Sequence, residues 1–245
     1  MSERRISRDE AAINWRQLWM LVGIGIGIVV LWDTAILYPL KLLVVFFHEL
    51  SHGLAAYLTG GRIVEIQIVP QQGGLCITAG GSRFVTLSAG YLGSLIWGGV
   101  ILVVAARTHA DKAVSVSLGL LLILVSVVWI RPMMGFGFVF GVACGIGLAG
   151  VGAMLPREAN DFLLKVIGLT NCLYAVLDIK SDIMDRPGLE SDAVMLAELT
   201  GIPGRIWGAG WILVAVIAAF YFLTMACTED GKRGRDVMPT LPPVH

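Results

Sequence analysis

The chain contains several apolar runs of about twenty residues, separated by short polar connections. One run extends from Ala113 to Ile130 and the next from Gly135 to Leu155, with Arg131 and Pro132 between them. A helix of about twenty residues crosses the roughly 30 Å hydrocarbon core of a bilayer. Charged residues make up 15% of the sequence, against about 25% in soluble domains. These features predict an integral, multi-pass membrane protein.

The apolar runs predict an all-α polytopic fold with about six or seven transmembrane helices. The expected membrane segments are 18–37, 39–58, 84–106, 113–130, 135–155, 160–179 and 206–227. They would form a single transmembrane domain over 18–227, with a cytosolic lead over 1–17 and a disordered tail over 228–245. Arginines in the lead place it on the cytoplasmic side, but the weak Lys and Arg bias of the loops leaves the crossing count and the side of the C-terminus open.

A short stretch between the second and third segments has the pattern of a β-hairpin. Val64, Ile66 and Ile68 alternate with polar side chains within 62–69, and 70–74 has the composition of a turn. The stretch is too short and too polar to cross a bilayer, so we expect a membrane-associated β-hairpin after the second helix. Two interpretations remain open: a plain surface hairpin, or an exposed edge that holds an extended substrate by strand addition.

The second predicted helix contains the pattern H-E-x-x-H, formed by His48, Glu49 and His52. Residues four apart share one face of a helix, so the two imidazoles can bind the same metal ion. Glu49 lies beside them, where its carboxylate can take a proton from water. The pattern is the signature of zinc proteases. Ionisable side chains within a membrane helix usually mark a functional site, which makes a chance match the weaker interpretation.

A catalytic zinc site usually has three protein ligands and one open position. The two other histidines, His109 and His245, lie in a predicted loop and in the tail, so we expect a carboxylate as the third ligand. Asp178 ends the sixth segment and is the favoured candidate, and Asp182, one helical turn later, is the alternative. The expected cofactor is Zn²⁺. The formal net charge of zero gives no reason to expect a nucleic-acid partner.

An apolar helix with His48-Glu49-Leu50-Ser51-His52-Gly53, a hairpin after it and a late Asn171…Leu177-Asp178 segment resemble the site-2 protease family of intramembrane zinc metalloproteases. The second motif of that family runs Asn-x-x-Pro-x-x-x-Leu-Asp-Gly. The stretch from Asn171 to Ile179 lacks the Pro and the Gly, and its Asn and Asp are one residue closer together. This divergence is similar to a compact bacterial-type branch, for which a bacterial plasma membrane is the expected location.

The resemblance implies a zinc-dependent endopeptidase that hydrolyses peptide bonds of membrane-anchored proteins within the lipid bilayer. His48, His52 and Asp178 would hold the zinc, and Glu49 would be the catalytic base. Asn171 is expected either to hydrogen-bond the substrate or its oxyanion, or to pack two membrane helices together. Two other functions remain open: a catalytically inactive membrane scaffold, and a transporter that passes a metal ion along the same histidines.

Overall fold

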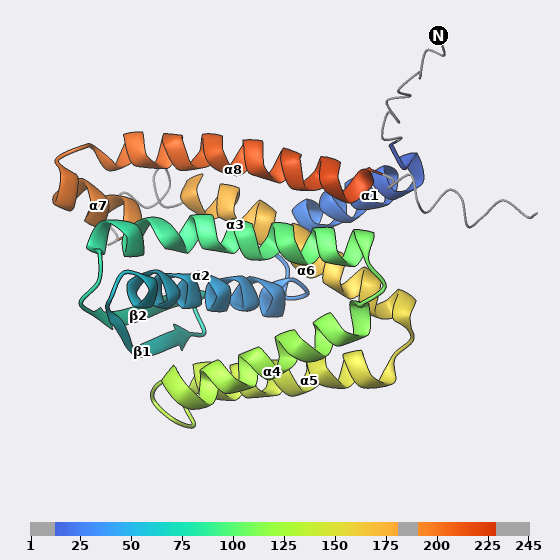
Figure 1. Cartoon of the computed structure of the whole chain (residues 1–245), viewed down its shortest axis with the longest axis horizontal. Coiled ribbons are helices and arrows are strands. Elements are labelled where there is room, and N and C mark those ends of the chain that lie inside the picture. Colours follow the sequence, from blue (N-terminus) through green and yellow to red (C-terminus); the bar gives the residue numbers. More distant parts are fainter. Residues whose placement is uncertain (1–12, 181–190, 229–245) are drawn as a thin grey trace, which may run out of the picture.

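The computed structural model describes residues 13–180 and 191–228, which form a helical bundle with one small sheet (Figure 1). The helices are α1 (Trp15–Val30), α2 (Tyr38–Leu58), α3 (Arg83–Arg107), α4 (Asp111–Trp129), α5 (Phe136–Met154), α6 (Arg157–Lys180), α7 (Asp192–Thr200) and α8 (Gly204–Cys227). The strands β1 (Arg62–Val69) and β2 (Gly73–Ala79) lie between α2 and α3. Most of the predicted lead and almost all of the predicted tail are outside the described residues.

Five of the described helices are long and apolar enough to cross a membrane, namely α3, α4, α5, α6 and α8. Together with the hairpin after α2, they confirm the polytopic helical fold predicted from the sequence. α1 ends at Val30 and is therefore shorter than the predicted first span. The chain turns after it because Thr34 bonds back to the carbonyl of Leu31, through its N–H at 2.9 Å and its hydroxyl at 2.6 Å. Pro39 then occupies the first turn of α2.

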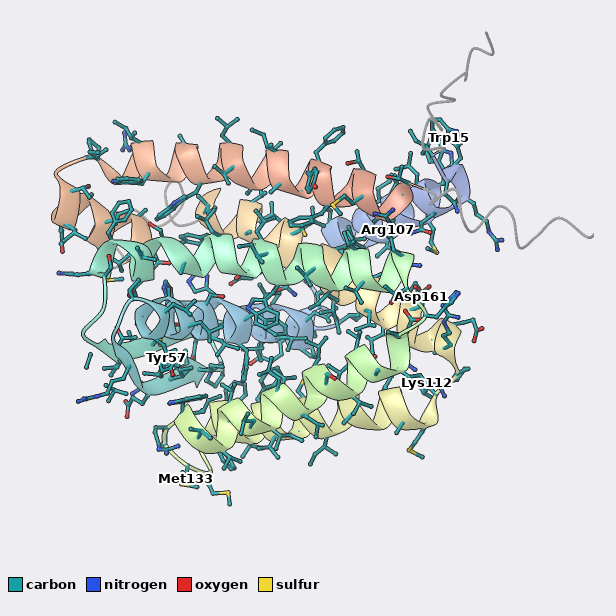
Figure 2. All side chains as sticks on the ribbon, in the orientation of Figure 1. Trp15, Tyr57, Arg107, Lys112, Met133 and Asp161 are labelled. Atoms are coloured by element: carbon teal, nitrogen blue, oxygen red, sulfur yellow. The ribbon has the colours of Figure 1, made fainter. Side chains whose placement is uncertain are left out.

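The start of α1 and the end of α8 lie side by side at one end of the bundle (Figure 1). The Asn14 N–H donates to the carbonyl of Cys227 at 2.8 Å, and the Gln17 side-chain amide donates to the carbonyl of Ala226 at 2.7 Å. Both ends of the described chain are therefore on the same side. Figure 2 shows four labelled residues at this end, Trp15, Arg107, Lys112 and Asp161.

α2 lies at the centre of the molecule. Its residues are buried almost continuously from Lys41 to Ala56, and it packs against α3, α6 and both strands. Phe46, Phe47 and Leu50 belong to the largest hydrophobic cluster, to which α4 and β1 also contribute. A polar group in such a position is tolerated only where neighbouring groups or a polar cavity satisfy it. The surroundings of α2 therefore decide what its polar residues can do.

Small residues bring the membrane helices into close contact. A Cβ atom on Gly98 of α3 would lie 2.7 Å from the carbonyl oxygen of Gly168 on α6, and one on Gly168 would lie 2.8 Å from the carbonyl oxygen of Gly98. α4 and α5 approach each other in the same way at Gly119 and Gly145. This is the packing that small residues provide inside a bilayer, where hydrophobic burial does not drive helices together.

β1 and β2 form an antiparallel hairpin in which Arg62 lies opposite Ala79 and Val69 lies opposite Gly73. The Arg131 N–H donates to the carbonyl of Ile66 at 2.9 Å, so the connection between α4 and α5 occupies the outer edge of β1. The outer edge of β2 pairs with no other strand among the described residues. The predicted hairpin is confirmed, and its free edge belongs to β2.

Candidate metal centre

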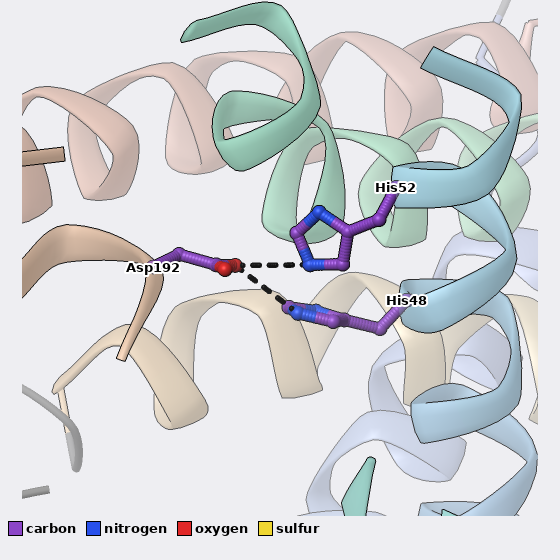
Figure 3. A group of neighbouring side chains, drawn as sticks. All are labelled: His48, His52 and Asp192. Carbon is purple, nitrogen blue, oxygen red and sulfur yellow. Dashed lines mark ion pairs between the residues drawn. The ribbon is translucent and has the colours of Figure 1, made fainter. Parts of the chain in front are cut away.

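α2 and α7 bring His48, His52 and Asp192 together (Figure 3). Oδ2 of Asp192 lies 3.2 Å from Nε2 of His48 and 3.3 Å from Nε2 of His52. The two histidines share one face of α2, as their spacing predicted. Asp192 is the first residue of α7, which follows α6 in sequence but folds back against α3 and α8. The cluster therefore joins two segments that are far apart in the chain.

Apolar contacts hold α7 in this position. Ala193 and Leu196 of α7 are buried with Leu87 and Tyr91 of α3 and with Trp211 of α8. α7 ends at a glycine in the left-handed conformation (φ 72°), which sends the chain directly toward α8. The apolar face of this short helix therefore fixes the place of its first residue.

Neighbouring groups orient both imidazole rings. Nδ1 of His52 lies 2.6 Å from the carbonyl oxygen of Thr86 on α3. Because a carbonyl only accepts, Nδ1 is the donor, and in the neutral ring the lone pair is on Nε2, which faces Asp192. The His48 ring meets Tyr91 edge to face, with ring centroids 5.0 Å apart. Such outer contacts fix the tautomer and direction of metal-binding histidines.

The cluster could hold a metal ion. Oδ2 of Asp192 is buried and has no hydrogen-bond partner within the described parts of the chain. Two imidazole lone pairs and a carboxylate oxygen at these distances repel one another unless a cation or a proton lies among them. Gly90 of α3 leaves space there, because a Cβ atom on it would lie 2.5 Å from Nε2 of His52 and closer still to Nε2 of His48. Two histidines and one carboxylate are also a known ligand set of catalytic zinc.

Asp192 carries the charge that such a site needs. Burial disfavours its ionised form, but the positive charges that His52 and His48 carry when protonated outweigh burial and lower the pKa of Asp192 well below its ordinary value. Its place in the first turn of α7 adds to this effect, since the helix dipole favours a negative charge there. Asp192 is therefore a carboxylate at neutral pH, the form that binds metal ions.

Glu49 lies beside the cluster and is held by β2. Its carboxylate accepts a hydrogen bond from the backbone N–H of Cys76. Gly74 makes room for it, because a Cβ atom on Gly74 would lie 2.5 Å from Cγ of Glu49. Burial, together with the neighbouring Glu49, raises the pKa of the Cys76 thiol to about 12, so this thiol is protonated at neutral pH.

The histidines, Glu49 and Asp192 line one cavity of about 640 Å³. α2 forms one wall of it, and β2 with the following Gly80 and Gly81 forms another. Residues of α3 and the start of α7 also line it, as does Tyr174 of α6. β2 and the start of α7, which line this cavity, lie at the end of the bundle opposite to the end where α1 begins (Figure 1).

The two aspartates predicted as third ligand are not tested by the structure. Asp178 lies in the last turn of α6, and its side chain is outside the described residues. Asp182 falls in 181–190, which is also outside them. The structure brings Asp192 to the histidines instead, a residue that lies between the predicted segments 160–179 and 206–227. Nothing in the sequence indicated where the short helix that carries Asp192 docks.

Asn171 lies away from the cavity. It is fully buried on α6 against Gly98 of α3, and its side-chain amide donates to the carbonyl of Ile167 at 2.9 Å. It does not belong to the residues that line the cavity. This position fits the second role considered for Asn171, the packing of two membrane helices, and its predicted role in substrate binding stays a prediction.

The fold and the site define a polytopic membrane protein with an H-E-x-x-H metal centre. The model of the Peptidase M50B-like family matches residues 21–222, and the chain therefore belongs to that family. This match confirms the resemblance to the site-2 proteases and does not test the bacterial branch. No curated protein and no solved structure gives a significant match. Membership of the family implies a metallopeptidase embedded in a membrane, with membrane proteins as its substrates.

Proposed function

We propose that the protein is a zinc-dependent intramembrane endopeptidase in which His48, His52 and Asp192 hold the metal and Glu49 is the catalytic base. One observation carries this proposal: two imidazole Nε2 atoms and one buried carboxylate oxygen converge on a single point beside Glu49. Bound zinc would supply a Lewis acid that polarises the scissile carbonyl and makes water more acidic.

Glu49 performs the proton transfers in this proposal. It takes a proton from the attacking water and passes it to the leaving amine. The backbone N–H of Cys76 holds its carboxylate in place, while Gly74 gives it room to lie against β2. Thr86 keeps His52 in the tautomer whose Nε2 is free for the metal.

The free edge of β2 supports the interpretation of the hairpin as a substrate-binding edge. A peptide bond inside an intact helix is shielded by the helix, so a membrane-anchored substrate must be locally extended to be cut. Gly73, Gly74 and Cys76 of β2 line the cavity beside Glu49. A substrate strand added along β2 would therefore cross the cavity next to the catalytic base. It would pair with backbone groups of β2 other than the Cys76 N–H, which already donates to Glu49.

A metal transporter is the less favoured alternative, because an ion path requires a chain of polar groups through the bundle. Within residues 13–180 and 191–228, the other buried charged side chains lie in separate pairs. Lys41 pairs with Asp33 at 3.9 Å and lies over Trp32, and Lys165 pairs with Asp161 at 2.7 Å. The third buried charge, Asp111, pairs with Arg157 at 2.7 Å. These pairs do not form a continuous path to the histidines.

Cleavage with and without Glu49 tests the proposal. The wild-type protein and Glu49→Gln would each be reconstituted in liposomes with membrane proteins of the organism that encodes the chain, and new peptide termini would be mapped by mass spectrometry. We expect cuts within membrane segments by the wild type only, with the same zinc content in both proteins. Cuts at the same positions and rates by Glu49→Gln would refute the assigned base. A wild type that holds zinc and cuts nothing would favour the scaffold.

A further inference from the structure

Ser191 occupies the position at which serine normally caps a helix. Its backbone is extended (φ −109°, ψ 162°), and its carbonyl accepts the Met195 N–H at 2.9 Å, as expected of the residue before the first turn of α7. Its hydroxyl, however, makes no capping hydrogen bond. Ser191 therefore does not cap the helix, which is the most common role of a serine at this position.

Ser191 is buried beside the metal centre. Ser191 is 7% exposed, and its Oγ has no hydrogen-bond partner in the described parts of the chain. Ser191 lines the same cavity as Glu49 and the histidines, and it directly precedes Asp192. A buried polar group without a partner is costly and uncommon, and one that lines a cavity can hydrogen-bond what the cavity binds.

The amino end of α7 adds a second attraction for negative charge. The Ser191 side chain does not cap the helix, so it satisfies none of the N–H groups in the first turn of α7. Ser191, Asp192 and Met195 all line the cavity, so this end of the helix and its positive dipole lie at the cavity wall. The ligand that fits here carries a partial or full negative charge on oxygen.

We propose that Ser191 is an oxyanion donor, whose hydroxyl hydrogen-bonds the carbonyl oxygen of the scissile peptide bond. The assignment rests on the proposed peptidase function. When water attacks the carbonyl carbon, a new C–O bond forms and the π pair of the carbonyl moves onto its oxygen, where Ser191 stabilises it. When the C=O bond re-forms, the C–N bond breaks and the amine receives its proton through Glu49. Ser191 donates a hydrogen bond throughout and gives up no proton.

This assignment gives the site a donor that lines the cavity, whereas Asn171 lies between α3 and α6 and is not among the lining residues. It also explains why a serine directly precedes the carboxylate at the metal centre. One short helix would then place both a metal ligand and an oxyanion donor, with α3 and α8 fixing the two together through Ala193 and Leu196.

Two probes of the zinc-loaded, full-length protein test the role of Ser191. The first probe is a phosphinic pseudo-peptide, whose tetrahedral oxyanion imitates the attacked carbonyl. The second is the matching amide peptide, measured in a Glu49→Gln background so that it is not cut. Affinity for both probes and zinc content would be compared for wild type, Ser191→Ala and Ser191→Thr. Ser88→Ala is the matched control, since the Ser88 hydroxyl bonds only within its own helix, to Phe84 at 2.9 Å.

We expect Ser191→Ala to bind the phosphinic probe at least about tenfold more weakly, with unchanged amide affinity and unchanged zinc. Ser191→Thr keeps a hydroxyl and should retain most of the phosphinic affinity, and Ser88→Ala should match the wild type. Equal phosphinic affinity of wild type and Ser191→Ala would overturn the assignment, as would loss of zinc or an equal loss for both probes. Failure of the zinc-loaded wild type to bind the phosphinic probe would instead refute the peptidase function on which the assignment rests.

Discussion

Asp192 lies 3.3 Å from His52 although the two residues belong to helices that are far apart in the chain. The contact exists because α7 folds back against α3 and α8 instead of extending away from the bundle. Different contacts fix the positions of these two residues. His52 is placed by α2 and oriented by Thr86, whereas Asp192 is placed by the apolar face of α7. Substitutions on α2 or on α7 can therefore alter the candidate metal centre independently.

Replacement of Asp192 by Ala should abolish tight zinc binding, because it removes one of three donors and leaves two histidines. Asp178→Ala, at the position favoured by the sequence, should keep one zinc per chain. Zinc content of the purified variants, measured by plasma mass spectrometry, checks both expectations. If Asp178→Ala lost its zinc and Asp192→Ala kept it, Asp178 would be the third ligand and Asp192 would have another role.

Gly90→Ala should weaken zinc binding by at least about tenfold, since its Cβ would occupy the space between the two Nε2 atoms. Gly147→Ala is the matched control on α5, where a Cβ atom would have nothing within 4 Å. Competition with a chelator of known affinity would measure the difference. If Gly90→Ala bound zinc as tightly as Gly147→Ala does, the metal would not lie at the point on which the two histidines converge.

Gly74→Ala should separate catalysis from metal binding. The added methyl group would displace Glu49 from β2, while the histidines and Asp192 keep their places. We expect full zinc content and a kcat reduced by about 100-fold, because small misplacements of a catalytic group have effects of that order. Gly147→Ala again serves as the control, since a Cβ atom there would have nothing within 4 Å and Gly147 does not line the cavity. A Gly74→Ala protein with wild-type kcat would argue that Glu49 does not need β2 to position it.

The cavity should open toward the face of the membrane opposite to the chain termini. The start of α1 and the end of α8 share one end of the bundle, and the flanking sequence is basic there, with Arg4, Arg5, Arg8 and Arg16 before or in α1 and Lys232, Arg233 and Arg235 after α8. The positive-inside rule then places this end in the cytoplasm and the hairpin end outside.

Single cysteines at the two ends of α4 would check this orientation. Lys112 lies at the end with the termini and Met133 at the hairpin end, and both are exposed (Figure 2). In a background without native cysteines, a membrane-impermeant maleimide added to intact cells should label Met133→Cys and not Lys112→Cys. The reverse labelling pattern would place the cavity on the cytoplasmic side.

Local features of the sequence determined the fold class and, at the candidate metal centre, the two histidines and Glu49. Apolar length alone identifies membrane helices, because a bilayer admits few other structures. The spacing of His48 and His52 fixes their common face through helix geometry, and the alternation around Ile66 indicates a strand. Each of these inferences depends on residues within a few positions of one another, which is why the structure agrees with them.

Only the tertiary structure decided which groups meet those histidines. The docking of α7 depends on contacts of Ala193 and Leu196 with two other helices, and no periodicity in the sequence reports such contacts. Gly90 and Gly74 are two of 30 glycines, and nothing local distinguishes them from glycines that pack helices or terminate them. The sequence determined that α2 offers two imidazoles and a carboxylate; packing against α3, β2 and α7 decided that they converge, because convergence is a property of long-range contacts.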